Sequence, residues 1–140
     1  MADILTRLPV AEFLREAAAA PFIFGEWDCC MFLANWVRFA RGGIDPAPDL
    51  RGAYTTDDGW RAKVEEEGGL VRLVGRIADR AGLGRVHPDD AMPGDVGVVR
   101  IGSNDFELGG VCAAPGKWAV KLQRGVQQFP GTRALAAWRL

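Results

Sequence analysis

The sequence predicts an α+β fold in which N-terminal helices pack on a C-terminal antiparallel sheet. Up to about residue 85, apolar residues recur at the three- and four-residue spacing of helices. From about residue 86 onward, short apolar and β-branched runs alternate with turns that contain glycine. Helices followed by strands are the order expected of an α+β protein. A length of 140 residues suits one domain, so we expect residues 1–140 to share a single core.

Four helices are expected in the first part of the chain. Pro9 suits the first turn of a helix, and an apolar stripe follows it. The second helix should stop at the Gly42-Gly43 pair, because glycine favours helix ends. Thr56 or Asp57 can cap the third helix. The predicted helices cover residues 9–20, 29–41, 56–67 and 70–81.

Four strands are expected in the second part. Val96 to Ile101 is an apolar run rich in valine, and Gly102 to Asp105 has the composition of a hairpin turn. The Pro115-Gly116 pair should separate the next two strands, and a last strand should contain Trp138. The predicted strands cover residues 96–101, 108–113, 118–122 and 134–140.

The charge and apolar patterns exclude two classes of partner. Lys and Arg number 17 against 18 Asp and Glu, a formal net charge of −1. Proteins that bind nucleic acid usually carry a basic excess, so we expect no nucleic-acid partner. The longest apolar stretch, Ala17 to Phe24, contains Pro21 and is far shorter than the ~20 residues that cross a membrane. We therefore expect no membrane span.

Cysteine and histidine usage predicts that the protein has no metal and no cofactor. The three cysteines are Cys29, Cys30 and Cys112, and the single histidine is His87. These residues lack the C-x-x-C spacing and the ligand number of a zinc site. Adjacent cysteines rarely bridge each other, so we expect free thiols, as in a protein made in the bacterial cytoplasm.

The start of the second predicted helix holds the best candidate for chemistry. Asp28 is a good N-cap, because its carboxylate can accept backbone N–H groups of the first turn. Cys29 then lies where the positive end of the helix dipole lowers the pKa of a thiol. Helical periodicity places Cys29 on one stripe with Leu33 and Trp36. We therefore expect Cys29 to face the later sheet as a candidate nucleophile.

A cysteine that begins a helix and faces a later sheet resembles the arrangement of papain-like hydrolases, in particular the NlpC-type cell-wall peptidases. Gly25…Asp28-Cys29 matches that family's helix start, and Pro93-Gly94-Asp95-Val96 matches its Pro-Gly-Asp before a strand. The family's His-x-Gly should fall near Leu108-Gly109-Gly110. The resemblance implies a papain-like fold and descent from a cysteine peptidase.

More of the chain is similar to small tail-module proteins of phages, prophages and gene transfer agents. That resemblance implies a tail-tip component that contacts the tail hub or other tail-tip proteins, with peptidoglycan as a further possible ligand. After synthesis in the cytoplasm, the protein would join a virion or a phage-like particle. The similar segments are Trp27-Asp28-Cys29-Cys30, Asp45-Pro46, Leu50-Arg51-Gly52-x-Tyr54 and Ala134-Leu135-Ala136-Ala137-Trp138-Arg139.

The chain departs from the peptidases at the position of their catalytic histidine, which holds Leu108. A thiol nucleophile needs a base within hydrogen-bond reach, and leucine cannot act as one. His87 is the only imidazole, and it reaches Cys29 only if its loop folds over the helix start. Glu107 and Asp95 can also lie near the site, but a carboxylate is a poor base for a thiol at neutral pH.

Two main hypotheses follow. In the first, the protein is a tail-tip subunit with a degenerate NlpC-like fold and acts mainly by structure and binding. Asp28 is then only a cap, and Cys29 is a small buried core residue. In the second, the protein is an active hydrolase of peptidoglycan, with Cys29 as nucleophile and His87 as base. A cytosolic toxin-type enzyme on the same fold would share this chemistry and lack tail partners.

Overall fold

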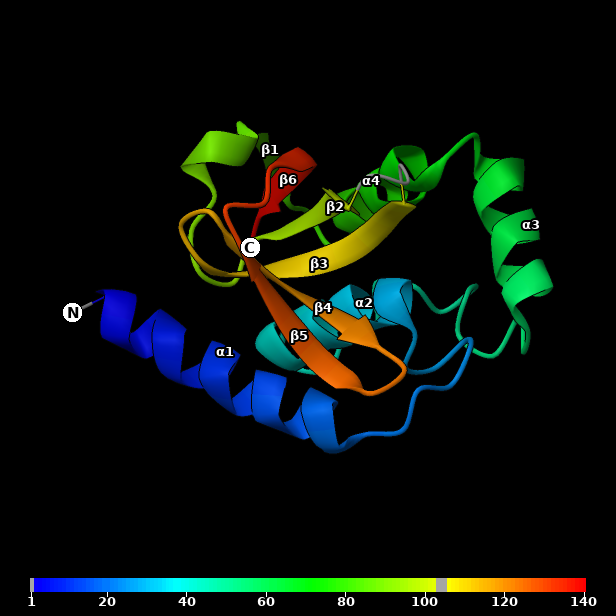
Figure 1. Ribbon diagram of the computed structural model, residues 1–140, viewed down its shortest axis with the longest axis horizontal. Coiled ribbons are helices and arrows are strands. Elements are labelled where there is room, and N and C mark those ends of the chain that lie inside the picture. The colour runs from blue at the N-terminus through cyan, green and yellow to red at the C-terminus, as the bar shows by residue number, and fades with distance from the viewer. Residues whose placement is uncertain (1, 103–105) are drawn as a thin grey trace.

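The fold combines four helices with a six-stranded antiparallel sheet (Figure 1). The computed structural model describes residues 2–102 and 106–140, and for residues 2–8 only the backbone. The strand order in the sheet is β1-β6-β2-β3-β4-β5. The elements are α1 (Ala2–Ala19), α2 (Cys29–Ala40), α3 (Asp57–Glu67), α4 (Leu70–Arg80), β1 (Gly84–Val86), the 3-10 helix η1 (Pro88–Asp90), β2 (Val96–Ile101), β3 (Phe106–Ala114), β4 (Lys117–Leu122), β5 (Gly125–Pro130) and β6 (Ala134–Arg139).

The helices differ in how deeply they lie in the core. α2 packs on β3 and β4, and most of its side chains are buried. α4 buries one apolar face, which includes Leu73, Val74 and Ile77. α3 has no buried residue along its length, and it stands to one side of the sheet in Figure 1. The sheet and α2 therefore form a fixed centre, to which α3 is attached from outside.

Both faces of the sheet are covered by apolar side chains. Val98 and Val111 belong to the cluster formed with the helices, whereas Val99 and Cys112 belong to a second cluster. This division follows from the two-residue period of a strand, which sends neighbouring side chains to opposite faces. Cys29 is a helical residue that joins the second cluster, so its side chain faces the strands.

The first helix is longer than the sequence predicts. α1 begins at Ala2, and Pro9 lies inside it instead of in its first turn. A proline inside a helix removes one backbone hydrogen bond, and the turns on both sides can still form. The residues before Pro9 include leucine, alanine and arginine, which favour helix and allow the helix to extend through the proline. The other predicted helices agree within about one residue, and Thr56 is the N-cap of α3.

Two strands were not predicted. β1 has only three residues, too few to show an alternating pattern. β5 is an edge strand with two exposed glutamines, Gln127 and Gln128, so it lacks the apolar run by which the other strands were recognised. The four predicted strands are present with small shifts of their ends. The predicted turn at Gly102 to Asp105 falls largely on residues 103–105, which lie outside the described residues.

Candidate functional site

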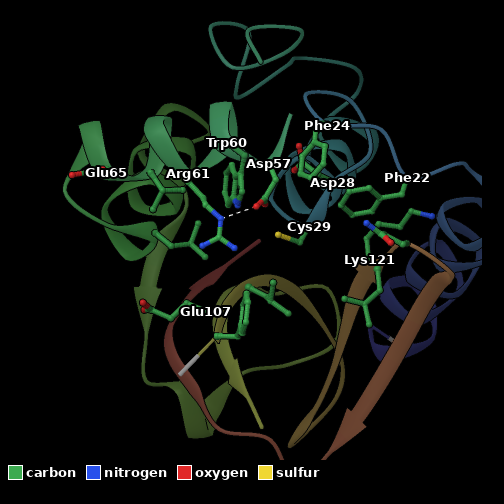
Figure 2. A pocket seen from close by; sticks show the side chains of 16 residues that line it. Phe22, Phe24, Asp28, Cys29, Asp57, Trp60, Arg61, Glu65, Glu107 and Lys121 are labelled. Atoms are coloured by element: carbon green, nitrogen blue, oxygen red, sulfur yellow. Dashed lines mark hydrogen bonds and ion pairs between the residues drawn. The ribbon is translucent and has the colours of Figure 1, made fainter. Parts of the chain in front are cut away.

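The candidate site is a cavity of about 550 Å³ at the start of α2 (Figure 2). The Cys29 sulfur points into the space between α3 and the strands. Its lining combines aromatic and aliphatic side chains with six charged ones. The residues that line the cavity include Phe22, Phe24, Asp28, Cys29, Asp57, Trp60, Arg61, Glu65, Phe106, Glu107, Leu108, Lys121 and Leu122.

Asp28 organises one wall of this cavity. One carboxylate oxygen accepts the backbone N–H groups of Cys30 and Met31, both at 2.9 Å, as a helix N-cap should. The other oxygen accepts the backbone N–H of Gly25 at 2.8 Å and the hydroxyl of Tyr54 at 2.6 Å. Asp28 is 1 % exposed, so these four bonds hold a buried charge. These four bonds give the carboxylate a structural role at the start of α2.

The loop before α2 is joined to the loop that ends in Tyr54. Gly52 donates its backbone N–H to the Gly25 carbonyl at 3.0 Å. Gly25 has φ +85°, and a Cβ atom there would lie 2.5 Å from the Tyr54 carbonyl oxygen. Only glycine fits such a close approach in this left-handed conformation. Two segments far apart in the sequence are therefore fixed to each other beside Cys29.

The Cys29 thiol is a weak acid in this setting, contrary to the expectation from the helix dipole. Burial raises its pKa to about 12, and the neighbouring carboxylate of Asp28 adds to the rise. Hydrogen bonding from the backbone of Gly109 opposes this shift in part. Loss of hydration and a negative neighbour therefore outweigh the helix N-terminus, and the thiol stays protonated at neutral pH.

The strand that faces Cys29 is β3 at Leu108 and Gly109. A Cβ atom on Gly109 would lie 2.8 Å from the Cys29 carbonyl oxygen and 2.6 Å from a methyl carbon of Leu33. α2 therefore approaches the strand so closely that only glycine fits. Leu108, the residue before Gly109, lines the cavity together with Cys29. The side chain at this position of the cavity wall is therefore apolar and cannot accept a proton.

His87 is not brought to Cys29. It lies before η1 as its N-cap and lines a different surface depression, together with Arg133 and Leu135. Its Nδ1 accepts the backbone N–H of Asp89 at 3.1 Å, and its side chain is 60 % exposed. The only histidine of the chain therefore serves a local turn.

The two acids considered near the site occupy different places. Glu107 lines the cavity. Asp95 instead ties the end of β6 to the turn before β2, because it accepts the backbone N–H groups of Met92 at 2.8 Å and Leu140 at 3.1 Å. It also forms an ion pair with Arg139 at 3.2 Å. The aspartate of the Pro-Gly-Asp motif therefore has a structural role.

The other two cysteines, Cys30 and Cys112, are also buried in the core. Burial raises the pKa of the Cys112 thiol to about 12, and Asp95 contributes. The pKa of Cys30 lies well above its usual value for the same first reason. All three cysteines are free. Among the side chains of residues 9–102 and 106–140, no cluster of His, Cys, Asp or Glu could hold a metal. No helix within the described part of the chain is long and apolar enough to cross a membrane.

Sequence reasoning missed several residues of the cavity. Lys121 is fully buried, and its ammonium group donates to the carbonyl oxygens of Ala17, at 2.8 Å, and Ala20 at the end of α1. The position of this lysine within the apolar run of β4 could have indicated a buried ammonium group that needs hydrogen-bond acceptors. Trp60 and Arg61 reach the cavity from α3, and Arg61 pairs with Asp57 at 2.7 Å. No periodic pattern marks these two as neighbours of Cys29, because α3 buries no face.

Fold and site together define an α+β protein in which a helix that begins with a buried thiol packs against an antiparallel sheet. The chain belongs to the family DUF6950, described as a domain of unknown function, whose model matches residues 3–140. No curated protein and no solved structure matches the chain.

Proposed function

We propose that the protein is a tail-tip subunit of a phage or phage-like particle, with a degenerate NlpC-like, papain-like fold. Its main role is that of a structural subunit that binds other proteins near the tail hub. The observation that supports a non-catalytic role most is the surroundings of Cys29. Its thiol has a raised pKa, and the adjacent cavity wall is Leu108. A nucleophile in this state lacks both ionisation and a proton acceptor.

The placement of the similar segments supports the proposed ancestry. Gly25, Asp28 and Cys29 surround the start of a helix that packs on β3, the strand that follows the Pro-Gly-Asp turn. Tyr54, from a distant segment of the tail-protein resemblance, bonds directly to Asp28. Gly25, Asp28 and Tyr54 thus form one connected unit at the start of α2, and its hydrogen bonds stabilise the fold.

The alternative is an active cysteine hydrolase of peptidoglycan. One observation favours it: the Cys29 sulfur lines a cavity of about 550 Å³, which has room for part of a substrate. This reading needs a base that the described residues do not place beside the thiol.

Localisation tests the proposed role directly. Phage-like particles would be purified from the source bacterium, and their separated tails analysed by mass spectrometry. We expect this chain in the tail fraction in a fixed ratio to the hub protein. Its presence only in the cell lysate would contradict the proposal.

Purified peptidoglycan tests catalysis, with wild type, Cys29→Ala and Leu108→His compared. We expect no release of peptide fragments by wild type above the Cys29→Ala background. Leu108→His should speed alkylation of Cys29 by iodoacetamide, because an imidazole beside the thiol promotes its ionisation. Leu122→His, in the same cavity wall, is the matched control. Cleavage by wild type that is lost in Cys29→Ala would establish the alternative.

A further inference from the structure

The lining of the cavity at Cys29 is acidic. Four carboxylates line it, those of Asp28, Asp57, Glu65 and Glu107, against the two cations of Arg61 and Lys121. With all six groups ionised, the lining has a net charge of −2, whereas the whole chain is nearly neutral. The negative charge is therefore concentrated at this cavity, and an apolar cavity wall strengthens its effect on a ligand.

Most of these charges are already engaged by the protein. Asp28 accepts four hydrogen bonds, Arg61 pairs with Asp57, and Lys121 donates to the end of α1. Glu65 and Glu107 differ. Neither forms an ion pair with a side chain of residues 9–102 or 106–140, although Arg100 is the register partner of Glu107 in the sheet. Figure 2 shows both glutamates on the side of the cavity away from Lys121.

Arg61, held by its ion pair with Asp57, lies between these two glutamates and Cys29 in Figure 2, and the other walls there are apolar. Trp60 is partly buried, Phe106 is 53 % exposed, and Leu108 lines the floor beside Cys29. An indole face attracts a cation, and aliphatic walls suit the methylene stem of a long basic side chain. Arginine combines a flat cation that stacks on aromatic rings with such a stem.

We propose that this cavity accepts an arginine side chain from an extended segment of a partner protein. The methylene stem would pack on Leu108 and Trp60, and the guanidinium would lie near Glu65 and Glu107. This inference rests on the proposed role as a binding subunit and names the chemistry of the segment that the cavity receives. Charge complementarity selects this occupant, since a neutral apolar segment would leave the two carboxylates partly desolvated.

Backbone-amide NMR with a short probe tests the proposal. The tripeptide acetyl-Gly-Arg-Gly-amide is titrated into the ¹⁵N-labelled chain, and its neutral analogue with citrulline in place of arginine serves as the comparison. We expect the arginine probe to shift amide resonances of Cys29, Trp60 and Leu108. It should bind at least about fivefold more tightly than the citrulline probe, since each charge pair at a partly exposed site contributes about two- to fivefold.

Glu65→Gln and Glu107→Gln should each weaken the arginine probe about two- to fivefold and leave the citrulline probe unchanged. Glu12→Gln, an exposed change on α1 outside the cavity, is the matched control and should change neither. Equal binding of the two probes, or resonance shifts confined to another surface, would overturn the inference. If arginine binding fails in this way, the chain can still be found in the tail fraction, so the proposed function would stand. Cleavage of peptidoglycan would instead overturn the proposed function, and arginine binding could still be measured.

Discussion

The two walls of the cavity at Cys29 are built in opposite ways. Asp28 and the start of α2 lie in the core, and four hydrogen bonds to one buried carboxylate fix their geometry. α3, on the other side, has no buried residue and is held mainly through the partly buried Trp60 and Val64. The thiol therefore sits in the rigid part of the molecule, and the surface that a partner would touch combines strand β3, at Glu107 and Leu108, with the more exposed helix α3.

The largest effect should come from Asp28→Ala on the fixed wall. The substitution removes the N-cap and leaves the Tyr54 hydroxyl and the Gly25 backbone N–H without an acceptor in a buried place. We expect the free energy of unfolding in urea to fall by about 3 kcal/mol. Asp28→Asn keeps an acceptor and should lose less. A loss under about 1 kcal/mol for Asp28→Ala would show that this wall does not depend on the carboxylate.

Gly109→Ala should come next, because its Cβ atom would overlap with Leu33 and with the Cys29 carbonyl. We expect a loss of about 2 kcal/mol from overpacking, measured by urea unfolding. Gly84→Ala is the matched control, since nothing lies within 4 Å of a Cβ atom at that strand residue. Equal stability of the two variants would mean that α2 and β3 separate easily.

Tyr54→Phe removes only the hydroxyl that donates to Asp28 at 2.6 Å. We expect a loss of about 1.5 kcal/mol, because a hydrogen bond to a charged group is worth more than a neutral one. A double-mutant cycle with Asp28→Asn measures the coupling between the two side chains. Strict additivity would contradict a direct interaction.

The smallest effect should come from Thr56→Ala on the outer wall. Thr56 accepts the backbone N–H of Gly59 at 3.1 Å as the N-cap of an exposed helix. We expect a loss of about 0.5–1 kcal/mol, with faster amide hydrogen exchange confined to α3. Exchange that also accelerates in α2 would show that the two walls unfold together.

The fold could be predicted to the extent that periodicity and turn residues signal it. Helix α2 with its Asp28 cap and the central strands were predicted because their apolar patterns are strong. α1 before Pro9 and the polar edge strand β5 were not, because neither matches a local rule: one continues through a proline, and the other has few apolar residues.

The site was harder to predict, because its properties come from tertiary contacts. The position of Asp28 as an N-cap follows from its local sequence, but its bond to Tyr54 depends on the packing of two loops. Likewise, the helix position of Cys29 suggested a lowered pKa, whereas burial raises it. Burial of this degree depends on β3, which no local pattern around Cys29 can show.

Titration of the Cys29 thiol is the most direct test of the proposed non-catalytic role. The ¹³Cβ resonances of labelled cysteine would be followed with pH in the folded chain, and Cys29→Ser would assign the signal. The structure predicts no ionisation of Cys29 below about pH 10, since burial raises its pKa to about 12. A midpoint at or below about pH 7 would reveal an activated thiolate and contradict the account.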